Sequence, residues 1–150
     1  MILEGRFRAK APIQKLWDML LQPETLQACV PGAEKIERVN DRTYNCIVRQ
    51  KVGPISVCFK FKTTLTKMEP PTYLEMEGEG EDIGKAGHFT QKTTIDLKKI
   101  GEDEVEISYK CNASIVGKLA MFGDRILKAK AKKVEAEFTE RLKDQVLSQP

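Results

Sequence analysis

The stretch that decides the fold is Gly117–Val146, GKLAMFGDRILKAKAKKVEAEFTERLKDQV. Its apolar residues recur mostly at steps of three and four, the spacing of one helical face, while Lys, Arg and Glu fill the opposite face. The apolar positions are Leu119, Phe122, Ile126, Leu127, Ala131, Val134, Phe138, Leu142 and Val146. The pattern predicts an amphipathic helix of about thirty residues, roughly 45 Å long, which requires a packing partner along its length.

The chain before this helix reads mainly as strands. Ile2–Ala9 alternates in polarity and predicts a first strand, after which Pro12 and Pro23 each suit the first turn of a short helix. Further segments with a period of two follow at 33–39, 44–52, 55–65, 74–80, 89–97 and 105–115. Short turns between strands favour antiparallel pairing. We therefore predict an α+β fold in which a curved antiparallel sheet wraps around the long C-terminal helix.

Length and composition are those of one soluble globular domain spanning residues 1–150. The chain is 41% hydrophobic and 31% charged, and no apolar run approaches the ~20 residues of a transmembrane helix. Met1–Arg6 has neither the basic nor the apolar segment of a secretory signal, so we expect the protein to work in the cytoplasm. The cysteines form no Cys-x-x-Cys pair and predict buried free thiols: Cys29, Cys46, Cys58 and Cys111.

The formal charge of +3 is concentrated in the predicted C-terminal helix. Residues 1–117 are balanced, whereas residues 118–150 carry eight basic and five acidic side chains. A run without any acidic residue contains Arg125, Lys128, Lys130, Lys132 and Lys133. These residues form either a solvated helix face or a surface that binds an anionic membrane or an acidic protein partner. Nucleic acid binding is not expected, since no aromatic residues interleave the basic ones.

Residues that would mark a catalytic or metal site are nearly absent. The single histidine, His88, falls out of phase with the buried face of its strand and is expected at the surface. None of the common nucleophile, phosphate-binding or zinc-protease motifs occurs. Alternating glutamates along 75–81 predict a solvated strand face, and Gly78 and Gly80 between them predict a bulge or strong curvature. We therefore predict no catalytic residue, metal ion or cofactor.

The inward faces of the predicted strands combine apolar and polar side chains. Four polar residues share these faces and need hydrogen-bond partners if they are buried: Gln50, Gln91, Thr93 and Tyr109. They are either satisfied groups within a closed core or the polar end of a ligand cavity between sheet and helix. In the second case, inward strand positions and the helix stripe supply the apolar lining: Val48, Phe59, Phe61, Met76, Leu119, Phe122 and Ile126.

Short motifs along almost the whole chain resemble one known family. They are Ala11-Pro12 with Trp17, Pro23-Glu24, Cys29 to Glu34, Val52-Gly53-Pro54-Ile55, Gly78-Glu79-Gly80 and Gly117 to Arg125. On these residues the chain resembles the family of the carbon monoxide dehydrogenase G subunit, within the START-like (SRPBCC), birch-pollen-allergen-like helix-grip superfamily. The resemblance implies a seven-stranded antiparallel sheet that grips the C-terminal helix over a hydrophobic cavity, with two short helices after the first strand.

The same resemblance implies a function. Family members resemble carriers of an apolar ligand, a lipid or a quinone, that accompany molybdenum-containing CO dehydrogenase-type oxidoreductases and recruit the partner enzyme to the membrane. Our leading hypothesis is therefore a non-enzymatic accessory protein that holds such a ligand, either in the cytoplasm or peripherally at the inner face of the membrane.

Two other hypotheses belong to different classes. The first is an enzyme of the cyclase/aromatase or hydratase type, which needs an acid or base inside the pocket. The inward faces offer only Tyr109, Cys46 and Cys111 as proton-bearing groups, and no inward His, Asp or Glu is evident. The second is an interaction protein that binds no ligand.

Overall fold

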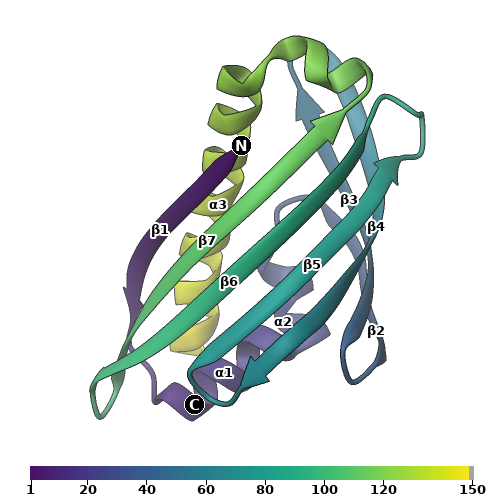
Figure 1. Cartoon of the computed structure of the whole chain (residues 1–150). Coiled ribbons are helices and arrows are strands. Elements are labelled where there is room, and N and C mark those ends of the chain that lie inside the picture. Colours follow the sequence, from purple (N-terminus) through teal and green to yellow (C-terminus); the bar gives the residue numbers. More distant parts are fainter. Residues whose placement is uncertain (149–150) are drawn as a thin grey trace.

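The computed structural model describes residues 1–148, in which seven strands form one antiparallel sheet curved around a long helix (Figure 1). The strands are β1 (Ile2–Ala9), β2 (Ala33–Asn40), β3 (Thr43–Val52), β4 (Ile55–Glu69), β5 (Tyr73–Asp82), β6 (His88–Gly101) and β7 (Glu104–Val116). From β2 to β7 each strand pairs with the next one along the chain, and β1 pairs with β7. The predicted antiparallel sheet is confirmed.

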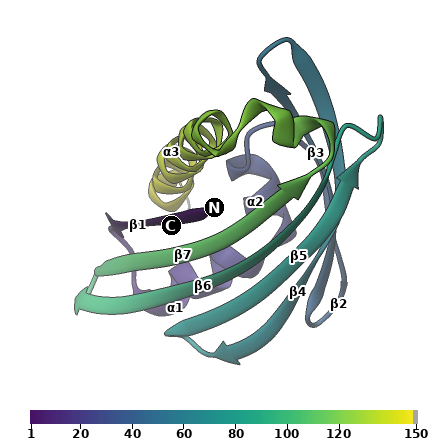
Figure 2. The ribbon, with the colours of Figure 1, turned by 45° about the horizontal axis from the view of Figure 1, so that its top comes forward.

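The α-helices lie together on one side of this sheet, which curves around them (Figure 2). Between β1 and β2 come α1 (Ile13–Leu21) and α2 (Pro23–Cys29), and Pro23 occupies the first turn of α2, where its missing N–H has no intrahelical partner to lose. After β7 come the short 3-10 helix η1 (Lys118–Phe122) and α3 (Asp124–Ser148). The helix α3 contacts both β1 and α2.

The single helix predicted for 117–146 is wrong at its beginning. Gly117 and Gly123 have φ angles of 97° and 83°, a region that is strained for residues with a side chain and that breaks an α-helix. The residues between them form η1, so α3 starts only at Asp124. Its 25 residues give a length of about 37 Å, shorter than predicted.

Two hydrophobic clusters anchor opposite ends of α3. The larger one packs the last turns of the helix, with Leu142 and Val146, against α1, α2 and the sheet. The smaller one joins residues of β3, β4, the β5–β6 turn, η1 and the start of α3: Val52, Val57, Ala86, Leu119 and Leu127. Between these clusters the side chains of sheet and helix leave a space, which is the candidate site.

Gly78 and Gly80 of β5 leave space that a larger residue would fill. A Cβ at Gly80 would lie 2.2 Å from Cβ of Phe61, and one at Gly78 would lie 2.8 Å from Nε2 of Gln91. Their missing side chains let Phe61 from β4 and Gln91 from β6 lean over β5. The irregularity in the β4–β5 pairing lies instead between Leu65 and Lys67, so of the two predicted alternatives, a bulge or strong curvature, the bulge at the glycines is wrong.

Candidate ligand-binding site

A cavity of about 550 Å³ lies between the concave face of the sheet and α3. Its lining is mostly aliphatic and aromatic and draws on every strand, on α1 and α2, and on the middle of α3. Among the lining residues are nine of those predicted from the sequence: Val48, Gln50, Phe59, Phe61, Met76, Gln91, Thr93, Tyr109 and Leu119. The prediction therefore placed nine of its eleven residues correctly on the cavity wall.

Two residues predicted for the apolar lining, Phe122 and Ile126, do not line the cavity. Phe122 is partly buried in the smaller cluster, where its ring faces Gly53 in the β3–β4 turn. Ile126 is 49% exposed on the outside of α3. Both errors have one cause: the chain breaks at Gly123, which changes the phase between η1 and α3, whereas the prediction assumed a continuous helix.

Polar side chains gather at one part of the cavity wall. The Thr93 hydroxyl donates to Oε1 of Gln91 at 2.6 Å, and the Cys111 thiol donates to the same oxygen at 3.4 Å. The Tyr109 hydroxyl donates to Oε2 of Glu135 on α3. We call Gln91, Thr93, Tyr109, Cys111 and Glu135 the polar cluster. Three of its members are among the four polar residues predicted from the sequence.

Gln50, the fourth predicted polar residue, lies apart from this cluster. Its amide Nε2 donates to the carbonyl oxygen of Pro31 at 2.7 Å and ties β3 to the loop after α2. Gln50 therefore lines the cavity but bonds to the backbone, whereas the other three predicted polar residues bond to side chains of the polar cluster.

The sequence prediction missed Glu135, and the expectation that no acidic side chain points inward is wrong. The residue lines the cavity, and its Oε1 is buried without any hydrogen-bond partner. A signal is present in the sequence, because Glu135 follows Ala131 by four residues and precedes Phe138 by three. It occupies a position of the apolar stripe, although its charge favours a solvated face.

Room for the cluster comes from glycines on neighbouring strands. A Cβ at Gly5 of β1 would lie 2.6 Å from the Tyr109 hydroxyl oxygen, and Gly78 leaves the corresponding space for Gln91. Gly5 pairs with Tyr109 and Gly78 pairs with Gln91 in the sheet register. Two larger polar side chains are thus each accommodated opposite a glycine.

The family model CoxG, which describes the G subunit of carbon monoxide dehydrogenase, matches residues 5–147. The chain belongs to this family. The match spans the motifs at Pro31–Glu34 and Val52–Ile55, so the resemblance stated from the sequence is confirmed. Among curated protein sequences, no match to this chain was found.

Solved structures share the fold of this CoxG family member. A conserved protein from Geobacillus kaustophilus is 21% identical with a TM-score of 0.90, over 98% of this chain and 95% of that chain. A START superfamily protein from Mycobacterium smegmatis is 12% identical with a TM-score of 0.74, over 99% of each chain. The Zhui aromatase/cyclase from Streptomyces sp. R1128 is 10% identical with a TM-score of 0.72, over 97% and 93%. The predicted helix-grip fold is confirmed.

Burial keeps the proton-bearing groups of the cavity in their protonated forms. Burial, followed by the bond to Glu135, raises the pKa of Tyr109 well above its ordinary value. Burial also raises the pKa of Cys46 to about 11 and raises the pKa of Cys111. The thiolate is the nucleophilic form of cysteine, so these residues are weak nucleophiles near neutral pH. All four cysteines are free, and Cys111 alone is only partly buried.

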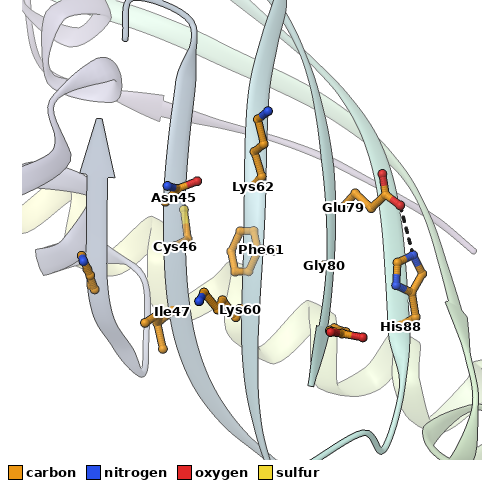
Figure 3. Close-up of a pocket in the computed structure, with 11 residues that line it drawn as sticks. Asn45, Cys46, Ile47, Lys60, Phe61, Lys62, Glu79, Gly80 and His88 are labelled. Atoms are coloured by element: carbon orange, nitrogen blue, oxygen red, sulfur yellow. Dashed lines mark ion pairs between the residues drawn. The ribbon is translucent and has the colours of Figure 1, made fainter. Parts of the chain in front are cut away.

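The opposite face of the sheet carries a second, charged hollow of about 740 Å³ (Figure 3). Its charged side chains alternate along the strands with the residues that line the cavity, and they are Lys35, Lys60, Lys62, Glu79, Glu81 and His88. Nε2 of His88 lies 3.4 Å from Oε1 of Glu79, and the His88 side chain is 42% exposed. These mixed charges face solvent, as predicted for the glutamates, although Glu75 is partly buried and accepts a bond from Tyr73. The inner cavity is therefore our candidate site.

Asp82 fixes the turn between β5 and β6. Its carboxylate accepts hydrogen bonds from the backbone N–H groups of Cys58, at 2.8 Å, and Ala86, at 3.0 Å. Ala86 in turn accepts a bond from the N–H of Leu119 in η1. The bond from Ala86, followed by that from Cys58, lowers the pKa of Asp82.

Asp82→Asn is expected to lower the free energy of unfolding by about 1–3 kcal/mol at pH 7, because an amide cannot accept both bonds. Since the folded-state pKa is lowered, the contribution of Asp82 is present above its unfolded pKa of about 4 and is lost as pH falls through the folded value. Urea unfolding from pH 7 to pH 3 measures this, and the difference between variant and wild type should shrink on acidification. Asp103→Asn, in the exposed β6–β7 turn, is the control and should change little.

None of the helices within residues 1–148 combines the length and the apolar composition needed to span a bilayer. Within the same residues, no group of three His, Cys, Asp or Glu side chains is arranged to hold a metal ion.

Proposed function

We propose that this chain is a non-enzymatic carrier that holds an apolar small molecule, lipid-like or quinone-like, between the sheet and α3. The observation that carries the proposal is the cavity itself. Its volume of about 550 Å³ lies within the roughly 300–1,000 Å³ of small-molecule sites, and its wall is apolar except for a few convergent polar groups. Membership of the CoxG family supports a second part: the carrier serves a CO dehydrogenase-type molybdenum oxidoreductase.

The protein purified from its own host is expected to carry a lipophilic mass in native mass spectrometry. Ala131→Phe should remove most of this mass, because a phenyl ring at a cavity-lining position of α3 occupies the ligand's volume. The matched control is Ala136→Phe, at a position of the same helix that does not line the cavity, which should keep the wild-type occupancy.

An empty wild-type cavity would contradict the carrier function and favour a ligand-free interaction protein. Equal occupancy in both variants would show that the mass binds elsewhere. Ligand extracted before and after incubation separates the carrier from an enzyme, since a carrier returns the same mass that it bound.

A second candidate function, a cyclase/aromatase-like enzyme, is favoured by one observation. The Glu135 carboxylate and the Tyr109 hydroxyl are bonded to each other inside the cavity, so the acid or base that such chemistry requires is present. Against it, Tyr109 holds its proton firmly because its pKa is raised, and the buried Cys46 thiol is not activated. We therefore favour the carrier.

To load an apolar ligand from a membrane, the protein must approach that membrane. The end of the molecule formed by η1 and the start of α3 exposes both apolar and basic side chains. Met121 is 86% exposed and Ile126 is 49% exposed, and Lys118 and Arg125 beside them in the chain are also exposed. Arg125, Lys128 and Lys132, at spacings of three and four, form what we call the basic face of α3. We propose that this end docks peripherally on the inner, anionic face of the cytoplasmic membrane.

The protein is expected to sediment with anionic but not with neutral liposomes, and less at ~0.3 M than at ~0.05 M salt because exposed charges are screened. Lys128→Glu combined with Lys132→Glu should weaken binding at least about tenfold, since each basic residue near the surface contributes ~1 kcal/mol. Lys98→Glu with Lys99→Glu makes the same charge change on the exposed end of β6 and should have a smaller effect. If both double variants lose liposome binding equally, the binding depends on net charge and not on the basic face of α3.

A further inference from the structure

The carboxylate of Glu135 is the least satisfied polar group in the cavity. One of its oxygens, Oε2, accepts the proton of the Tyr109 hydroxyl, while the other, Oε1, is buried and has no partner. None of the ion pairs within residues 1–148 includes Glu135. A buried acceptor without a donor is destabilising, and a charged one especially so, which makes Oε1 a group that a ligand would satisfy.

The neighbours of Glu135 leave it as the open acceptor of the polar cluster. Oε1 of Gln91 already accepts two bonds, from Thr93 and Cys111, which fill the two lone pairs of a carbonyl oxygen. The only proton of the Tyr109 hydroxyl is directed to Glu135, and the raised pKa of Tyr109 keeps that proton in place. Oε1 of Glu135 is therefore the unfilled acceptor at this end of the cavity, and only a donated proton can satisfy it.

We propose that the ligand's polar head is a hydroxyl that donates to Oε1 of Glu135. This inference rests on the proposed function and names the class of ligand: an alcohol, phenol or reduced quinone carried on an apolar body. A head that only accepts, such as an ether or the carbonyl of an oxidised quinone, would leave Oε1 of Glu135 without a donor. A cationic head is disfavoured, because Lys130 of α3 also lines the cavity.

The test compares ligands with the same apolar body whose heads differ in hydrogen-bond donation and in charge. Delipidated protein is titrated by isothermal calorimetry with a long-chain 4-alkylphenol, with its methyl ether and with the corresponding alkylammonium. Wild type should bind the phenol at least ~10-fold more tightly than the ether, since hydrogen bonds to charged groups are among the stronger ones. The ammonium should bind less tightly than the phenol.

Variants at the cluster then assign the preference to Glu135. In Glu135→Gln the amide oxygen retains the Tyr109 bond and the NH₂ group replaces Oε1, so the preference for phenol over ether should vanish or reverse. Tyr109→Phe keeps the carboxylate and should keep the preference. Glu140→Gln, an exposed carboxylate on the same helix, is the matched control and should behave as wild type.

Each alternative outcome overturns a definite statement. Equal affinity of wild type for phenol and ether overturns the hydroxyl inference and leaves the carrier function standing. Tightest binding of the ammonium replaces it with a cation site. Binding of none of the three probes overturns the carrier function, and the inference falls with it. The wild-type comparison alone decides these points if Glu135→Gln does not fold.

Discussion

Gly32→Ala is expected to lower the free energy of unfolding by about 3 kcal/mol or more, enough to unfold much of a marginally stable domain. Gly32 has φ of 77°, and a Cβ there would lie 2.0 Å from the carbonyl oxygen of Arg49. The contact cannot relax locally, because the N–H of Arg49 donates to the carbonyl oxygen of Gly32 at 2.9 Å and holds the loop against β3. Urea unfolding followed by circular dichroism measures the loss.

Gly123→Ala separates the cost of the backbone conformation from the cost of the steric clash. Gly123 also has a positive φ, of 83°, but no atom lies within 4 Å of the Cβ that would be added. Its ψ of 158° places it in a region that almost only glycine occupies, so substitution should cost the backbone strain alone, about 1–3 kcal/mol. Equal losses at the two glycines would show that the clash with Arg49 relaxes freely.

Leu142→Ala is expected to destabilise the protein by about 2–5 kcal/mol, through lost burial and the void left behind. The side chain is 0% exposed in the larger cluster, where α3 packs against α1, α2 and the sheet. Phe138, one turn earlier, is only partly buried and lines the cavity, so Leu142 reports better on the attachment of the helix.

Leu147→Ala provides the control for this measurement on the same helix. Leu147 is 74% exposed, and its truncation should change the free energy of unfolding by no more than about 0.5 kcal/mol. A loss below ~1 kcal/mol at Leu142 would contradict the packing of the last turns of α3 against the larger cluster.

The sheet and the strand residues predicted for the cavity wall could be placed because both depend on a period of two. Val48, Phe59 and Met76 face inward by alternation alone, and the strand order follows from short turns. The single exception to that order, the pairing of β1 with β7, carries no local signal. It was not predicted, since the resemblance to the family of the CO dehydrogenase G subunit implied a seven-stranded sheet but no strand order.

The start of α3 and the inward position of Glu135 could not be predicted from the sequence. The period of three and four runs across Gly123 without interruption, so pattern alone could not place the break that moves Ile126 outward. Glu135 escaped prediction for the opposite reason, because its spacing is that of a buried position but its charge is typical of an exposed one. A buried carboxylate becomes evident only once Tyr109, from a distant strand, is seen beside it.

The pairing of β1 with β7 also bears on how the molecule folds. Leu3 lies opposite Cys111, whereas β2 to β7 are joined by hairpins whose contacts are close in sequence. Pairing β1 with β7 closes a loop of about 100 residues, which costs more entropy and is slower than forming a hairpin. The sheet from β2 to β7 should therefore form first, and β1 and α3 should dock late. The cavity does not exist until that docking, and an apolar molecule present during synthesis would be enclosed by the final step. Protein refolded from denaturant and then given ligand should therefore load more slowly than protein folded in its presence.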